Sequence, residues 1–153
     1  MKLLDFLDKE RIIPSLHSAG KEGILAELTE PLVATQKIRN SREAVNVLLE
    51  RERLGSTGIG EGIAIPHGKL KELKDVVAVF GRSLGGVDFD SMDGAPAKLF
   101  FLLMAPENSA STHLKALARI SRLLKDRAFR EELLQAESQD ELFEIISRED
   151  EKY

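Results

Sequence analysis

The feature that most constrains this chain is a glycine-rich run at residues 55–68, which reads Gly-Ser-Thr-Gly-Ile-Gly-Glu-Gly-Ile-Ala-Ile-Pro-His-Gly. Glycine tolerates left-handed backbone and lets main-chain N–H groups approach an anion closely. Pro66 lacks an N–H and has a fixed φ, so we expect His67 to be presented from a stiff loop. An imidazole held in this way can accept a phosphoryl group, relay a proton or bind a metal.

The composition is that of one ordinary globular domain, and we expect a single domain over residues 1–153. Hydrophobic residues make up 42% of the chain and charged residues 31%, and no cysteine is present to form disulfides or thiolate metal sites. The net charge of −4 argues against general nucleic-acid binding. Acidic residues near the start interrupt the apolar run that a signal peptide needs, and no apolar run is long enough to span a bilayer. We therefore expect a cytoplasmic protein without membrane insertion.

Hydrophobic periodicity predicts a mixture of helices and strands. Helical spacing indicates helices at 21–28, 41–53, 112–124, roughly 127–136 and 139–147. Pro31 should end or restart the first of these. Two apolar runs, at 76–80 and 99–104, are typical of buried strands. Because helices flank and alternate with strands, the pattern favours a single-domain α/β sandwich, with a central sheet between helices.

Two histidines are candidates for chemistry. A neutral imidazole is a good nucleophile near its ordinary pKa of about 6.5, and phosphohistidine is reactive enough to pass its phosphoryl group on. The glycines around His67 favour such a role over a purely structural one. His113 follows Ser111 and Thr112 and should lie in the first turn of a helix, where N–H groups and the dipole attract anions. It could contact a phosphoryl oxygen, or it could be a surface histidine; the residues alone leave both open.

Charged residues around the run offer further candidates. The guanidinium of Arg51 suits bidentate phosphate binding, although an arginine in the last helical turn also favours the helix dipole, and Arg53 competes for the same role. Glu61 could hold an imidazole tautomer, contact a partner protein or simply be solvated.

The glycine-rich run also resembles the signature of a known protein family. Residues 56–60, Ser-Thr-Gly-Ile-Gly, followed by 63–68, Ile-Ala-Ile-Pro-His-Gly, are similar to the active-site signature of phosphotransferase-system enzyme IIA domains of the fructose, mannitol and nitrogen-regulatory type. The resemblance extends along essentially the whole chain and implies a central mixed β-sheet with flanking helices. Residues 58–68 are at least as similar to nitrogen-regulatory members as to sugar-type ones, and we favour the regulatory branch.

The resemblance implies roles for individual residues. The histidine that matches His67 carries a transient phosphoryl group, and a second active-site histidine precedes a Leu-x-x-Leu helix, as His113 does here. The family's phosphate-binding arginine corresponds to Arg51. Ser56, Thr57, Glu61 and Gly68 fall within the phosphoryl-binding loop, in which we expect N–H groups and the hydroxyls of Ser56 and Thr57 to be donors.

The implied reaction needs neither cofactor nor metal. The donor would be the phosphocarrier HPr or a nitrogen-branch relative, and the acceptor a IIB protein or a regulatory target. The alternative within the family is the IIA subunit of a fructose- or mannitol-type uptake system.

Rival motifs are weaker. Gly62 to Lys69 has the wrong spacing for a Walker A loop, and no histidine pair has the spacing of a zinc site. The sequence Gly81-Arg-Ser-Leu-Gly85 matches a nucleophile elbow around Ser83, which leaves a serine hydrolase as a remote alternative. An elbow needs a helix directly after the serine, and the residues that follow are not helical in character.

Overall fold

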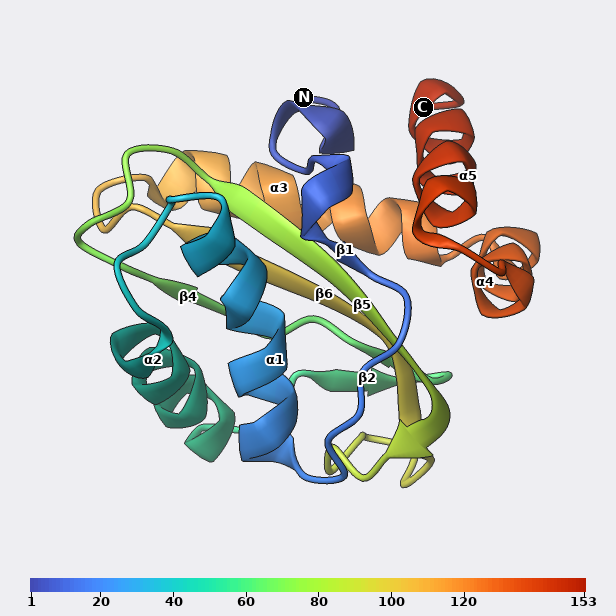
Figure 1. Cartoon of the computed structure of the whole chain (residues 1–153), viewed down its shortest axis with the longest axis horizontal. Helices are drawn as coiled ribbons and strands as arrows, with labels where there is room; N and C mark the ends of the chain where they lie inside the picture. The colour runs from blue at the N-terminus through green and yellow to red at the C-terminus, as the bar shows by residue number, and fades with distance from the viewer.

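The centre of the fold is an antiparallel pair of strands, β5 (Val77–Val87) and β6 (Ala97–Ala105). The computed structural model describes all 153 residues. It places this pair in a six-stranded mixed sheet of order β1-β5-β6-β3-β2, in which β4 also pairs with β6 (Figure 1). The short outer strands are β1 (Ile12–Ile13), β2 (Gly58–Gly60), β3 (Ile63–Ala64) and β4 (His67–Lys69).

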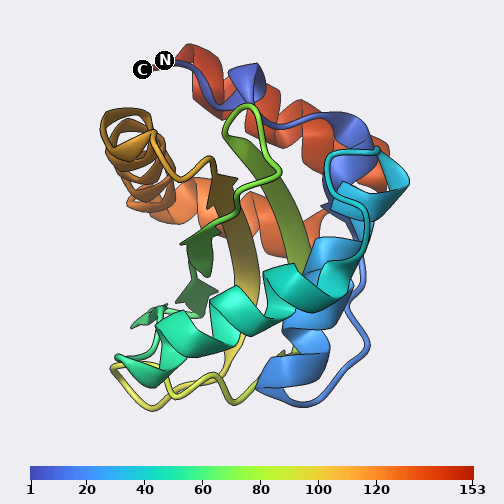
Figure 2. The same cartoon turned by 90° about the vertical axis from the view of Figure 1, so that its left-hand side faces the viewer.

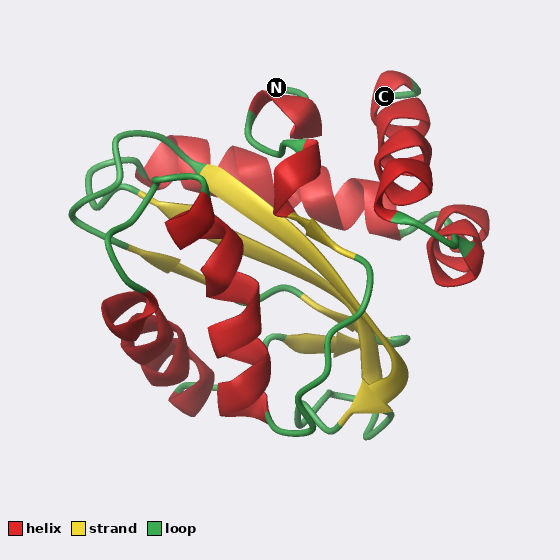
Figure 3. Ribbon diagram, viewed as in Figure 1, coloured by secondary structure: helices red, strands yellow, loops and turns green.

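Strand β6 is buried on both faces, which explains why its sequence is a continuous apolar run. Alternate residues enter opposite cores: Leu99, Phe101 and Leu103 lie in one hydrophobic cluster, whereas Phe100 and Leu102 lie in the other. Helices cover both clusters. The second cluster packs under α1 (Lys21–Ala34) and α2 (Ser41–Arg53), and the first under α3 (Ala110–Leu124), α4 (Arg127–Gln135) and α5 (Gln139–Glu151) (Figure 3). The expected α/β sandwich is confirmed.

The predicted helix starts are confirmed where a polar cap is present. Asn40 accepts from the Arg42 N–H, Asp126 from that of Phe129, and the Ser138 hydroxyl from that of Glu141. The expected break at Pro31 is wrong, because α1 continues to Ala34. Pro31 lies in the last turn, so its missing N–H removes only one intrahelical bond. The Thr35 N–H and hydroxyl both donate to the Pro31 carbonyl and complete the end of the helix.

The glycine-rich run is not the single loop that we expected. It forms the short strands β2, β3 and β4, with Glu61 and Gly62 at the turn between the first two, both at positive φ (56° and 78°). Strands β3 and β4 both pair in parallel with β6, and His67 lies opposite Leu103. The histidine is therefore held by the sheet itself.

Ser83 does not lie in a nucleophile elbow. Strand β5 continues beyond it to Val87, and the Ser83 side chain is buried in the sheet. The serine-hydrolase alternative therefore has no structural basis.

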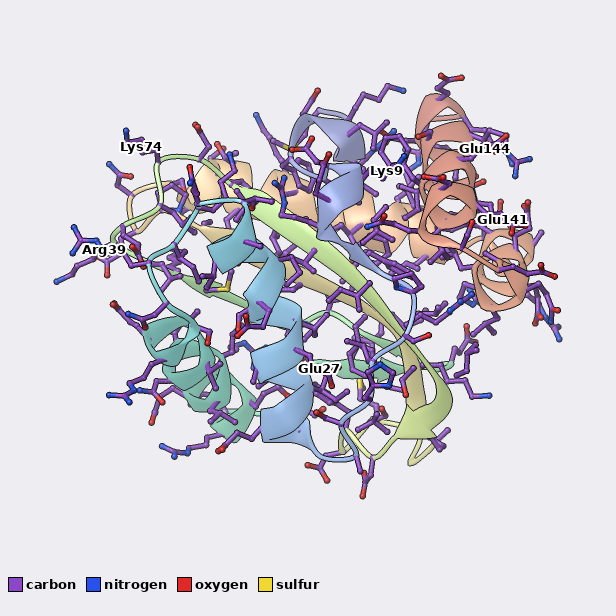
Figure 4. The ribbon with its side chains drawn as sticks, in the orientation of Figure 1. Lys9, Glu27, Arg39, Lys74, Glu141 and Glu144 are labelled. Carbon is purple, nitrogen blue, oxygen red and sulfur yellow. The ribbon has the colours of Figure 1, made fainter.

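Charged side chains of both signs are spread over the surface. Arg39 and Lys74 project at one end, and Lys9 lies near Glu141 and Glu144 of α5 at the other (Figure 4). Among the helices, none combines the length and hydropathy that crossing a bilayer requires.

A buried aspartate joins the two ends of the chain. Asp150 accepts from the N–H groups of Leu3 and Leu4 (2.9 and 3.1 Å) and pairs with Arg119 at 2.7 Å. Helix α5 is four residues longer than the predicted 139–147 because these tertiary contacts hold its last turn. The two termini consequently lie side by side (Figure 2), and the Lys2 ammonium donates to the Tyr153 carbonyl.

We expect Asp150→Ala to lower the free energy of unfolding by about 3–5 kcal/mol, because it leaves the guanidinium of Arg119 buried without its carboxylate. Denaturant unfolding measures this loss. Glu151→Ala, which changes the exposed neighbouring carboxylate, should stay within about 0.5 kcal/mol of the wild type. Equal effects of the two substitutions would contradict this role for Asp150.

Candidate active site

His67 lies at the start of β4 with its ring held by the main chain. Its Nδ1 lies 2.8 Å from the carbonyl oxygen of Ile65, and the side chain is half-buried. A carbonyl can only accept a hydrogen bond, so Nδ1 must carry the proton. In the neutral ring this leaves the lone pair on Nε2, which is the nitrogen available for attack on an electrophile or for binding a cation.

The structure brings His113 against His67. Their ring centroids are 5.6 Å apart, with an interplanar angle of 80°. His113 lies in the first turn of α3, as expected, although the helix begins at Ala110 rather than Thr112. Its side chain is buried, and its Nε2 has no hydrogen-bond partner. A buried nitrogen without a partner is costly in a native protein, and it is ready to bond to a group that enters the site.

The environment of His113 keeps it neutral. Burial, which disfavours the charged ring, is the main cause that lowers the pKa of His113, and the neighbouring His67 and Lys69 lower it further. At neutral pH this ring can therefore donate one N–H without adding a full positive charge beside His67.

Arg51 lies at the end of α2, next to the glycine-rich run. One of its terminal nitrogens donates to the carbonyl of Gly55 at 2.8 Å, and no other hydrogen bond occupies its guanidinium. Arg53 instead pairs with Glu50 and is largely exposed. The two arginines point in different directions, as residues two apart on a helix must.

The other predicted loop residues bond to neighbouring protein groups rather than to either histidine. The Ser56 hydroxyl donates to the Phe89 carbonyl, and the Thr57 hydroxyl donates to Glu52. Neither hydroxyl is thus free to bond to a phosphoryl group, contrary to expectation. Gly68 allows β4 to lie directly on α2, since a Cβ there would be 2.7 Å from Cγ1 of Val47.

Glu61 points away from the histidines. Its carboxylate pairs with Arg130 of α4 at 3.0 Å, and its N–H donates to Asp93 at 2.9 Å. The tautomer of His67 is instead held by the Ile65 carbonyl.

Glu52 is the residue that sequence reasoning missed. Its side chain is only 3% exposed, and its carboxylate accepts from the Thr57 N–H and hydroxyl and pairs with Lys21 at 3.2 Å. A signal for it exists, because Glu52 continues the buried helical face formed by Ala44 and Leu48 at spacings of four. A charged residue on a buried face requires partners.

Taken together, two imidazoles in edge contact form the centre of the candidate site. It offers one free nucleophilic nitrogen on His67 and one buried donor or acceptor on His113. The guanidinium of Arg51 lies against Gly55, at the start of the glycine-rich run that leads to His67. No group of three or more His, Cys, Asp or Glu side chains lies close enough together to hold a metal ion.

The lowered pKa of His113 should make stability pH-dependent. As the pH falls through about 6.5, the unfolded chain binds a proton at this residue while the folded protein does not, so acidification destabilises the fold. We expect His113→Gln to lose less stability than the wild type between about pH 7 and pH 5.5. Urea unfolding at several pH values measures the slope. His17→Gln, at an exposed histidine, should keep the wild-type slope, and an unchanged slope in His113→Gln would contradict the prediction.

Comparison with known proteins matches the chain to one family. Residues 5–149 match the family model described as "Phosphoenolpyruvate-dependent sugar phosphotransferase system, EIIA 2". The chain is 41% identical to a nitrogen regulatory protein of Bradyrhizobium diazoefficiens, over 96% of this chain and 95% of that protein. It is also 41% identical to the fructose-specific EIIABC component of Bacillus subtilis, over 98% of this chain but only 24% of that longer protein.

Comparison with solved structures gives the same family. The fold superposes on nitrogen regulatory protein IIA-Ntr from Neisseria meningitidis with a TM-score of 0.85 at 31% identity, covering 93% of this chain and 97% of that one. It also superposes on enzyme IIA mannitol from Escherichia coli, in a complex with phosphorylated enzyme IIB, with a TM-score of 0.76 at 28% identity over 94% and 99% of the chains. IIA domains of this system are phosphoryl-transfer components that partner with IIB domains. The chain belongs to this family of phosphotransferase-system enzyme IIA domains.

Proposed function

We propose that this protein, as one IIA domain spanning residues 1–153, carries a phosphoryl group on Nε2 of His67. The single observation that carries the proposal is the hydrogen bond between Nδ1 and the Ile65 carbonyl, which leaves Nε2 as the free nucleophile. As the Nε2–P bond forms and the bond from phosphorus to the donor breaks, the ring becomes cationic. The Ile65 carbonyl stabilises the proton on Nδ1, and the cationic ring is a good leaving group for onward transfer.

His113 and Arg51 would stabilise the transferred charge. The unpartnered Nε2 of His113 can donate to a phosphoryl oxygen, and the free N–H groups of Arg51 suit two more. Preorganised donors of this kind and accurate positioning account for most of the catalysis in phosphoryl transfer. Ser56 and Thr57 would act by shaping the loop, since their hydroxyls are engaged elsewhere. We propose no metal or cofactor.

Exposed apolar side chains around the site support a protein as the donor and acceptor. Leu54, Ile59, Met92 and Leu114 are 86%, 47%, 82% and 67% exposed. Leu54 follows α2, Ile59 lies within the glycine-rich run, Met92 donates its N–H to Gly58, and Leu114 follows His113. Such exposed apolar groups, on the segments that carry the candidate residues or contact them, fit docking of HPr or a nitrogen-branch relative, and of a IIB domain or regulatory target.

We favour the regulatory branch, in the cytoplasm. The likeness to a nitrogen regulatory protein covers nearly the whole of both chains and supports this choice. The second candidate is a IIA subunit for uptake of a fructose- or mannitol-type sugar, which the equal identity to the fructose-specific protein supports.

Incubation with phosphoenolpyruvate, enzyme I and HPr tests the phosphoryl-carrier proposal. We expect an acid-labile, base-stable adduct in the wild type and none in His67→Ala. His17→Ala, which changes an exposed histidine outside the site, should be labelled like the wild type. Acid-stable labelling, or full labelling of His67→Ala, would overturn the proposal.

The two arginines at the end of α2 should respond differently to lysine. Arg51→Lys should slow phosphorylation of His67 by roughly tenfold or more, because a point charge cannot reproduce two parallel hydrogen bonds to phosphate. Arg53→Lys retains the charge at a residue that faces solvent and should be nearly silent. Initial rates of transfer from phosphorylated HPr measure both effects. A larger loss at Arg53 would assign the phosphate contact to that residue instead.

A further inference from the structure

A buried carboxylate lies directly behind the glycine-rich run. Both oxygens of Glu52 accept hydrogen bonds from the same residue, one from the Thr57 N–H at 3.1 Å and the other from the Thr57 hydroxyl. This double contact fixes the position and orientation of the Thr57 backbone. The Glu52 side chain is only 3% exposed, so its carboxylate costs desolvation free energy that an apolar side chain at this position would not. Packing alone therefore does not account for a glutamate here.

Lys21 compensates the charge of Glu52. Its ammonium lies 3.2 Å from Glu52 and 3.2 Å from Asp90, and 4.8 Å from the centre of the Phe89 ring. Lys21 is the first residue of α1, where the helix dipole disfavours a cation. Its place there is explained by the carboxylates that it joins.

Two further hydrogen bonds continue from Thr57 to the histidine. The Thr57 carbonyl accepts from the Ile65 N–H at 3.0 Å, and the Ile65 carbonyl accepts from Nδ1 of His67 at 2.8 Å. Residue 66 is proline and has no N–H, so it cannot donate a competing hydrogen bond between the Ile65 carbonyl and the His67 ring. Ile65 is therefore held from one side by Thr57, which Glu52 holds, while its neighbours Ala64 and Pro66 bond to β6.

We propose that Glu52, paired with Lys21, is a positioning residue for His67. Through Thr57 and Ile65 it maintains the Nδ1–H tautomer and so keeps the lone pair on Nε2. Free histidine side chains prefer the opposite tautomer, with the proton on Nε2, so the protein must supply this bias. The inference rests on the proposed function only in naming Nε2 as the atom that is phosphorylated.

The test compares Glu52→Gln with Glu50→Gln, a matched change at an exposed glutamate on the same helix. Nitrogen-15 NMR of the His67 ring reports the tautomer in the free protein. We expect the wild type and Glu50→Gln to show a protonated Nδ1 and an unprotonated Nε2. In Glu52→Gln we expect a mixture with the Nε2–H form, and phosphorylation by HPr slowed by about tenfold. The glutamine amide has one acceptor oxygen where glutamate has two, so it cannot accept from the Thr57 N–H and hydroxyl through separate oxygens. It also loses the charge pairing with Lys21.

If Glu52→Gln does not fold, Thr57→Val and Lys21→Met remove the partners of Glu52 instead. Each should shift the His67 tautomer toward the Nε2–H form. An effect on the melting temperature alone, with the tautomer ratio and the rate equal to those of Glu50→Gln, would overturn the proposal. A wild-type protein that is not phosphorylated on His67 would refute the proposed function instead. The tautomer comparison would still decide the role of Glu52.

Discussion

The pairing of β6 with strands on both of its edges determines where the two candidate histidines lie. On one edge β6 pairs with β5, and on the other with β3 and β4. Strand β4 pairs with the last residues of β6, Leu103 to Ala105, and α3 begins shortly after that end. His67 at the start of β4 and His113 in the first turn of α3 therefore meet, although they are far apart in the sequence.

Two buried polar groups near the glycine-rich run are treated differently by the fold. His113 is buried without a hydrogen-bond partner at Nε2, a local cost that the surrounding packing has to offset. Glu52 is partnered by Thr57 and Lys21. Under the proposed function, His113 keeps a nitrogen available for a phosphoryl oxygen, whereas Glu52 supports the backbone of the run. Such a division suits a site that must be rigid yet able to bind a transient anion.

Local patterns predicted the elements well where a local cause dominates. The predicted starts of the helices near residues 41, 127 and 139 are confirmed, because capping by Asn40, Asp126 and Ser138 depends on neighbours within one turn. Of the two errors, one has a local cause and one a tertiary cause. Helix α1 continues past Pro31 because Thr35, four residues later, bonds to the Pro31 carbonyl and completes the last turn. Residues 63–64 and 67–69 form strands because the edge of β6, distant in the sequence, provides partners. Single-sequence patterns do not contain such partners.

The sequence by itself determined that the chain is an α/β protein with a candidate histidine in a glycine-rich segment, because hydrophobic period and glycine content are properties of neighbouring residues. Only the tertiary structure decided the functional geometry. It placed His113 against His67, turned Glu61 toward Arg130, and directed the hydroxyls of Ser56 and Thr57 into the protein. The physical reason is that a side chain's hydrogen-bond partners come from segments distant in the sequence, and burial selects those partners only once the sheet and helices have packed.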